Sequence, residues 1–158
     1  DSISCITVSR ATGALRLNKY LNSDGTPQGY MVAEVEGKSM RWYYKSLGRD
    51  SNYQMKVYPP RRTDGAKIIA NIWNYDDGWS SVEWWENGKK VADMRQTEME
   101  DPDYVDIFTE VKNATTRKYC APQKSHNMFE IMPSANARSG EVHVTDKFGV
   151  TYISEIQW

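Results

Sequence analysis

The chain has 158 residues, with 20 basic and 21 acidic side chains and a formal net charge of −1. This length suits a single domain of ordinary size that buries a core of its own. The balanced charges give no electrostatic footprint for nucleic acid, and no apolar run approaches the roughly 18–20 residues of a membrane span. We therefore expect neither a nucleic acid partner nor a membrane span.

Between residues 24 and 60 the pattern predicts a turn followed by three strands. Asp24-Gly25-Thr26-Pro27 is typical of a turn, because glycine tolerates positive φ and proline lacks a backbone donor. Beyond it, apolar and polar residues alternate, as in strands that bury one face. The second strand places Met40, Trp42 and Tyr44 on one face. The predicted strands span residues 30–35, 39–45 and 53–57, with Glu36-Gly37 turning the chain after the first and Pro59-Pro60 ending the third.

Residues 71–90, NIWNYDDGWSSVEWWENGKK, hold four of the six tryptophans. One alternating run leads into the turn Asp76-Asp77-Gly78, and a second run, residues 79–86, leads into Asn87-Gly88. Asn-Gly is a strong signal for a two-residue hairpin turn. Two adjacent hairpins so rich in aromatic residues must bury them against another layer. The segment therefore predicts an antiparallel β protein.

The second half of the chain predicts one helix among further strands. Asp101 fits an N-cap with Pro102 at the first helical position, and Asp103 suits the positive end of the helix dipole. Further strands are predicted at residues 91–94, 119–120, 128–132, 142–144 and 150–156, with a turn at 146–149. Many short strands with regular turns predict a mainly β chain. We expect an antiparallel β-sandwich with immunoglobulin- or fibronectin-like layering and one short helix.

Groups able to carry catalysis are few in this sequence. His126 and His143 are its two histidines, and neither stands in an H-x-H, D-x-H or HExxH spacing. A two-metal hydrolase site needs several shared ligands, because its cations lie roughly 3.5–4 Å apart. No G-x-S-x-G or phosphate-binding loop is present. We predict that the chain is not an enzyme and has no catalytic residue, cofactor or metal. His143 is expected to face solvent on a strand, and His126 to form local hydrogen bonds.

Two smaller features leave alternatives open. Asn74, Asp76 and Asp77 offer oxygen ligands for calcium, but such residues are also ordinary turn formers, and we favour the turn. Cys5 and Cys120 either form a bridge that closes most of the chain or remain two buried thiols.

The aromatic residues of the tryptophan-rich segment also allow two interpretations. They suit either a sugar-stacking platform on the surface or burial in the core or under a partner. Trp84 and Trp85 are adjacent in a predicted strand, so their side chains point to opposite faces. The candidate interaction surface consists of Trp73, Tyr75, Trp79, Trp84 and Trp85.

Seven segments of the chain resemble, in order, one family of domains. They are DGTPQGYMVAEVEG (24–37), RWYYKSLG (41–48), YQMKVYPP (53–60), ANIWNYDDGWSSVEWWENGKKVADM (70–94), DPDY (101–104), RKYCAPQKSHNMFEI (117–131) and VHVTDKFGVTYISE (142–155). The family is the C-terminal domain that follows the catalytic domain in calcineurin-like metallophosphoesterases of Bacteroides-type bacteria. By this resemblance, residues 1–158 form a single accessory β-sandwich domain, with the matching region at about 24–156.

The resemblance implies an accessory role. In that family the phosphoester chemistry belongs to a separate domain with D-x-H, G-D-x-x-D, G-N-H and G-H-x-H motifs. None of these motifs occurs here, so no catalytic residue is carried across. The domain is expected to pack on the catalytic domain of the same polypeptide through the aromatic surface and to shape its substrate cleft.

Two further expectations concern location and the competing functions. The family is often exported, which implies a periplasmic or extracellular location and suits a bridge between Cys5 and Cys120. The alternative functions are a carbohydrate-binding module that binds a glycan through the same aromatic residues, and a stand-alone enzyme of an unrecognised type.

Overall fold

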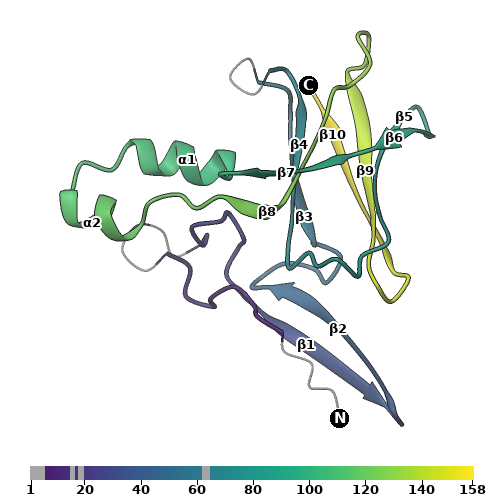
Figure 1. Ribbon diagram of the computed structural model, residues 1–158, viewed down its shortest axis with the longest axis horizontal. Helices are drawn as coiled ribbons and strands as arrows, with labels where there is room; N and C mark the ends of the chain where they lie inside the picture. Colours follow the sequence, from purple (N-terminus) through teal and green to yellow (C-terminus); the bar gives the residue numbers. More distant parts are fainter. Residues whose placement is uncertain (1–5, 15–16, 18–19, 62–64) are drawn as a thin grey trace.

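The computed structural model describes residues 6–14, 17, 20–61 and 65–158. In these residues it has two four-stranded antiparallel sheets, a separate two-stranded hairpin and two short helices (Figure 1). The two larger sheets share one core, so the predicted antiparallel β-sandwich is confirmed. The helices and the hairpin project from different sides of the sandwich.

The first sheet has the strand order β3–β4–β8–β7. β4 lies inside the sheet, and all five of its residues are buried. Ile68, Ala70 and Ile72 belong to the core between the sheets, while Ile69 packs with Tyr58 in a smaller cluster. Alternate side chains of β4 are thus buried on opposite faces of the sheet. The strands are β3 (Met55–Tyr58), β4 (Ile68–Ile72), β7 (Arg95–Met99) and β8 (Ser125–Ile131).

The second sheet has the order β10–β9–β5–β6. β5 and β6 are joined by the predicted two-residue turn, in which Asn87 and Gly88 have φ values of 52° and 71°. Both positive values fit a type I′ turn, whose twist matches that of the flanking strands. The predicted Asn-Gly hairpin is therefore confirmed. The strands are β5 (Ser81–Glu86), β6 (Lys89–Asp93), β9 (Ser139–Thr145) and β10 (Thr151–Gln157).

One continuous stretch of chain passes from the second sheet to the first. Met94 alone separates β6 from β7; its N–H donates to the carbonyl oxygen of Val82 at 2.8 Å, and its side chain is buried. Both sheets contribute to the core around it. The core residues are Met55, Ile68, Ala70, Ile72, Val82, Trp84, Met94, Phe129, Val142, Val144 and Tyr152.

The turn at residues 76–78 does not close a hairpin, so that part of the prediction is wrong. A turn does form there, because Asp76 Oδ1 accepts the N–H of Gly78 at 2.7 Å. However, β4 pairs with β3 and β8, whereas β5 pairs with β6 and β9. The segment between β4 and β5 crosses from one sheet to the other. Local turn chemistry bends the chain, but the burial of strand faces decides which strands pair.

α1 (Pro102–Thr109) begins where the sequence predicts, and its N-cap is a buried hydrogen-bonding centre. One carboxylate oxygen of Asp101 accepts the N–H of Tyr104 at 3.0 Å. The other accepts from the Tyr58 hydroxyl at 2.6 Å and from the Asn71 amide at 2.9 Å. Burial raises the pKa of Asp101, against the opposing effect of these donors. The cluster joins the start of α1 to β3 and β4.

α2 (Ala114–Tyr119) is a second helix, where the sequence predicts one helix and a strand at residues 119–120. The predicted strand is wrong. The Asn113 side chain caps α2 by accepting the N–H of Thr116 at 3.0 Å. A helix of six residues completes fewer than two turns, so it carries no apolar periodicity that distinguishes it from a strand.

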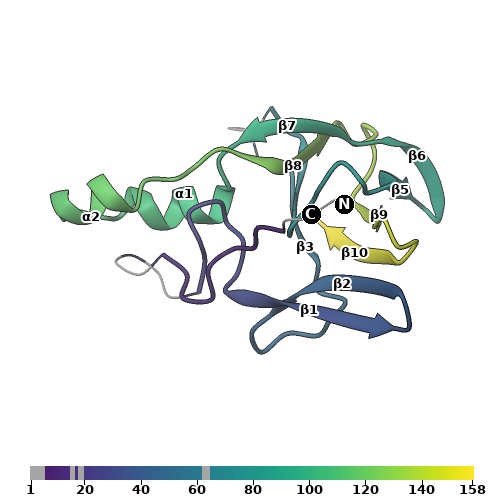
Figure 2. The same ribbon diagram turned by 60° about the horizontal axis from the view of Figure 1, so that its bottom comes forward.

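The hairpin stands apart from the sandwich and lies beneath it in Figure 2. β1 (Gly29–Glu36) and β2 (Ser39–Ser46) pair antiparallel around the predicted turn, whose Gly37 has φ 59°. Its root is anchored by Tyr44, which is buried and donates its hydroxyl to the carbonyl oxygen of Pro27 at 2.6 Å. From this root the hairpin extends to a free tip.

Candidate interaction surface

The structure divides the five predicted aromatic residues between core and surface. Trp73 and Trp84 are buried, with 1% and 0% of their surface exposed, whereas Tyr75, Trp79 and Trp85 are partly exposed. Of the five, the last three remain available to a partner. They occupy two places: Tyr75 and Trp79 lie in the crossing segment after β4, and Trp85 lies in β5.

Trp84 fills the centre of the sandwich. Its indole Nε1 donates to the carboxylate of Glu86 at 2.7 Å, and its ring centroid lies 6.2 Å from that of Trp158. A Cβ on Gly140 would come within 2.3 Å of the Trp84 ring, so the neighbouring strand approaches as closely as glycine permits. Trp84 therefore supports the fold and is not part of a contact surface.

Trp85 and His143 form a stacked pair on the side of the second sheet away from the core. Their ring centroids lie 4.6 Å apart, with an angle of 11° between the ring planes. Trp85 Nε1 donates to Glu83 at 2.9 Å, and His143 Nε2 lies 2.6 Å from the Glu141 carboxylate. With 17% of its side chain exposed, His143 is more buried than predicted. It covers one face of the Trp85 ring. Trp84 lies in the core and His143 covers Trp85, so these two tryptophans give no support to the glycan-binding alternative.

Tyr75 and Trp79 belong to a half-buried group that we call the aromatic edge, made of Trp42, Tyr75, Trp79 and Phe148. The ring centroids of Tyr75 and Trp79 lie 5.8 Å apart, and Trp42 packs edge-on against Phe148 at 4.8 Å. The Lys147 ammonium lies 4.5 Å from the centroid of the Trp42 ring. Sequence reasoning identified Tyr75 and Trp79 but missed Trp42 and Phe148, because the fold brings together segments that are far apart in the chain.

Two members of the aromatic edge, Trp42 and Tyr75, line a groove of about 310 Å³. Its other lining residues are Ile6 and Thr7 from the N-terminal segment and the polar residues Asn74, Asp76 and Lys147. The N-terminal segment therefore meets the sandwich beside the middle of the β1–β2 hairpin, at Trp42. Partly exposed aromatic rings with a polar border are typical of protein interfaces.

The acidic turn beside this groove is engaged within the chain. Asp76 Oδ1 accepts the N–H of Gly78 at 2.7 Å, and its Oδ2 accepts from the Lys147 ammonium at 2.7 Å. Both carboxylate oxygens thus have protein donors, which fits the favoured interpretation of a turn. In the described part of the chain, no three His, Cys, Asp or Glu side chains gather as metal ligands.

The remaining predicted residues are placed as follows. His126 is exposed, and its carbonyl oxygen accepts from Gln96 Nε2 at 2.7 Å. Cys120 is a buried free thiol, while Cys5 lies outside the described residues, so the structure lends no support to the bridge between them. None of the helices described is long and apolar enough to cross a membrane.

Comparison with known proteins identifies the family to which this chain belongs. Searches among curated proteins and among solved structures found no match. A search among protein families matched residues 14–152 to the family described as "C terminal of Calcineurin-like phosphoesterase". The match contains most of the predicted region 24–156 and extends it toward the N-terminus. Since it covers most of the 158 residues, the chain belongs to the family of C-terminal domains of calcineurin-like phosphoesterases.

Proposed function

We propose that this chain is an accessory domain that packs on the catalytic domain of its phosphoesterase and supplies none of the reacting groups. The family match supports the kind of protein, because the family is the C-terminal part of such enzymes. The observation that carries the packing role is the aromatic edge, whose four side chains stay half-buried and two of which, Trp42 and Tyr75, line a groove with the N-terminal segment. Tyrosine and tryptophan favour interfaces because they combine a large apolar area with a polar group.

A catalytic domain that covers the aromatic edge would complete the burial of these rings. The N-terminal segment lines the same groove through Ile6 and Thr7. A catalytic domain joined to this chain through that segment would be tethered next to Trp42 and Tyr75. A tether raises the effective concentration of the two surfaces, so a modest interface of about 600–1,500 Å² suffices. By fixing the two domains relative to each other, this contact would shape one wall of the substrate cleft.

The substitution Tyr75→Ala in the full-length phosphoesterase tests this proposal. We expect it to lower the melting temperature of the full-length enzyme by more than that of this chain alone, and to slow hydrolysis of p-nitrophenyl phosphate. Tyr119→Ala is the matched control, because Tyr119 is exposed at the end of α2, on the far side of the molecule (Figure 1). If Tyr75→Ala lowered both melting temperatures equally and left hydrolysis unchanged, Tyr75 would serve only the fold of this chain.

We also propose that the protein is periplasmic or extracellular. The support is the resemblance to an exported family. Fractionation of the native cells, followed by detection of this protein with an antibody, tests this. We expect the protein in the exported fraction. Its retention in the cytoplasmic fraction would contradict the proposal.

A further inference from the structure

One face of the β1–β2 hairpin carries apolar side chains from Tyr44 to the tip. Directly paired residues of antiparallel strands share a face, so the register assigns each side chain. Beyond the root pair Gly29–Ser46, which belongs to the same face, this apolar face consists of the pairs Met31–Tyr44, Ala33–Trp42 and Val35–Met40. The opposite face consists of the pairs Tyr30–Lys45, Val32–Tyr43, Glu34–Arg41 and Glu36–Ser39.

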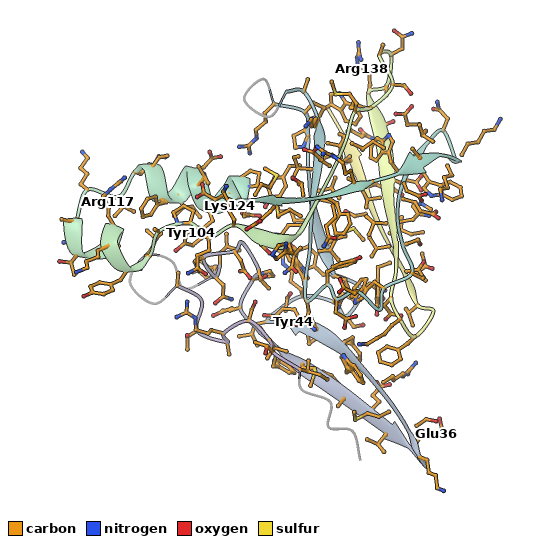
Figure 3. All side chains as sticks on the ribbon, viewed as in Figure 1. Glu36, Tyr44, Tyr104, Arg117, Lys124 and Arg138 are labelled. Carbon is orange, nitrogen blue, oxygen red and sulfur yellow. The ribbon has the colours of Figure 1, made fainter. Side chains whose placement is uncertain are left out.

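Cover from the rest of the chain decreases along the apolar face. Tyr44 at the root is 1% exposed, whereas Met40 and Val35 near the tip are 46% and 71% exposed. Figure 3 shows Tyr44 against the sandwich and Glu36 at the far tip, away from every other element. A two-stranded hairpin is marginally stable alone, and a projecting apolar strand pair favours association. The tip therefore has an apolar surface that this chain does not cover.

We propose that the apolar face of the β1–β2 hairpin packs against the catalytic domain of the same polypeptide. This contact rests on the proposed function and specifies where the two domains meet. The first described residues, Ile6 and Thr7, line a groove with Trp42, which belongs to that face. A catalytic domain joined through this segment would lie beside the middle of the hairpin, at Trp42. From there the exposed side chains of Met40 and Val35 continue the apolar face toward the tip.

The opposite face of the hairpin carries an ion pair and partly faces the chain itself, because Glu34, Arg41 and Tyr43 line a pocket with Asp146 and Tyr152. Glu34 and Arg41 pair across the strands at 2.6 Å, with 43% and 62% of their side chains exposed. A partner that covered this face would have to desolvate both charges, which costs free energy. The two faces therefore define which side of the hairpin the catalytic domain contacts. A second copy of the chain is the competing occupant of the apolar face, and concentration dependence distinguishes the two.

Amide hydrogen exchange tests the proposal, measured on the full-length phosphoesterase and on this chain alone. We expect the amides of residues 29–46 to exchange at least about tenfold more slowly in the full-length enzyme, because opening the hairpin there also breaks the contact. Met40→Asp should abolish this slowing. Ser39→Asp is the matched control, since it places the same charge on the neighbouring residue but on the opposite face. Both residues are exposed, so both variants should fold.

The outcomes separate this proposal from the one on which it rests. Slowing at residues 73–80 without slowing at 29–46 would overturn the hairpin contact and leave the accessory role intact. Unchanged exchange in every segment would contradict both. In the chain alone, the amides of the hairpin could exchange more slowly at higher protein concentration. That result would identify a second copy as the occupant and overturn the proposal. Equal effects of Met40→Asp and Ser39→Asp would also overturn it.

Discussion

The β5–β6 and β1–β2 hairpins arise from the same kind of sequence and end in different environments. Each has alternating apolar residues and a glycine with positive φ in its turn, 71° at Gly88 and 59° at Gly37. In β5, Trp84 is 0% exposed because the first sheet covers it, whereas Val35 in β1 is 71% exposed. Alternation thus identifies an apolar face, but it does not identify what covers that face.

Truncating one apolar side chain in each hairpin should give the largest contrast. We expect Trp84→Ala to lower the free energy of unfolding by about 3–5 kcal/mol, because it leaves a cavity at the centre of the core. Val35→Ala should cost less than about 1 kcal/mol, since its side chain is mostly in solvent. Urea unfolding of this chain, followed by circular dichroism, measures both. Similar losses would mean that the hairpin tip is covered within this chain.

Adding one methyl group at each end of the β1–β2 hairpin compares its root with its tip. A Cβ on Gly29 would lie 2.5 Å from the carbonyl oxygen of Lys45 and 2.7 Å from the Tyr44 ring, whereas one on Gly37 meets nothing within 4 Å. We expect Gly29→Ala to cost about 2–3 kcal/mol through overpacking. Gly37→Ala should cost about 1 kcal/mol, from its positive φ alone. Thermal melts of the two variants rank them, and the reverse order would show that the tip is the more constrained end.

A third test concerns the buried Asp101, whose hydrogen bonds join the start of α1 to β3 and β4. Burial raises its pKa in the folded chain above the ordinary value of 3.8. A group with a raised folded pKa stabilises the fold fully below its unfolded pKa, and this contribution is lost as pH rises through the folded pKa. Asp101→Asn removes this titration. The stability advantage of the wild type over Asp101→Asn should therefore decrease as pH rises above 3.8.

Urea titrations of the wild type and Asp101→Asn over a series of pH values measure this difference. Other carboxyl groups, including Glu83 and Glu130, have lowered pKa values and act in the opposite direction. They contribute equally to both proteins, so they cancel in the comparison. A difference that stays constant with pH would mean that Asp101 titrates alike in the folded and unfolded chain.

The smallest effect is expected for the charged face of the β1–β2 hairpin. The Glu34–Arg41 pair is largely exposed, so Arg41→Ala should change the free energy of unfolding of this chain by less than about 1 kcal/mol. The remaining difference should shrink in concentrated salt, because exposed ion pairs are screened. Thermal melts at low and high salt check this. A larger, salt-independent loss would show that the pair is buried against a neighbouring element.

Local signals predicted most elements of this fold. The Asn87-Gly88 turn, the end of β3 before Pro59 and the capping of α1 by Asp101 all depend on residues a few positions apart. Two predictions failed where local signals are weak or mislead. α2 is too short to show periodicity, and the 76–78 turn joins strands that belong to different sheets.

The candidate surface was only partly predictable for a related reason. Tyr75 and Trp79 were identified by their aromatic character. Trp84 was identified in the same way, but it is buried in the core. Trp42 and Phe148 join the aromatic edge because β2 and the β9–β10 turn meet in space. No pattern within one segment encodes such a meeting, since it depends on how separate elements pack.

The order of residues is enough to predict an antiparallel β structure, the positions of its main turns and the strand faces that are apolar. Each of these follows from short-range stereochemistry and from the alternation of side chains along a strand. Which apolar faces are covered depends on the packing of whole elements: Trp73 and Trp84 are buried, His143 stacks on Trp85, and Val35 and Met40 stay exposed on the projecting hairpin. Burial depends on packed layers, because it is set by contacts between residues that lie far apart in the chain.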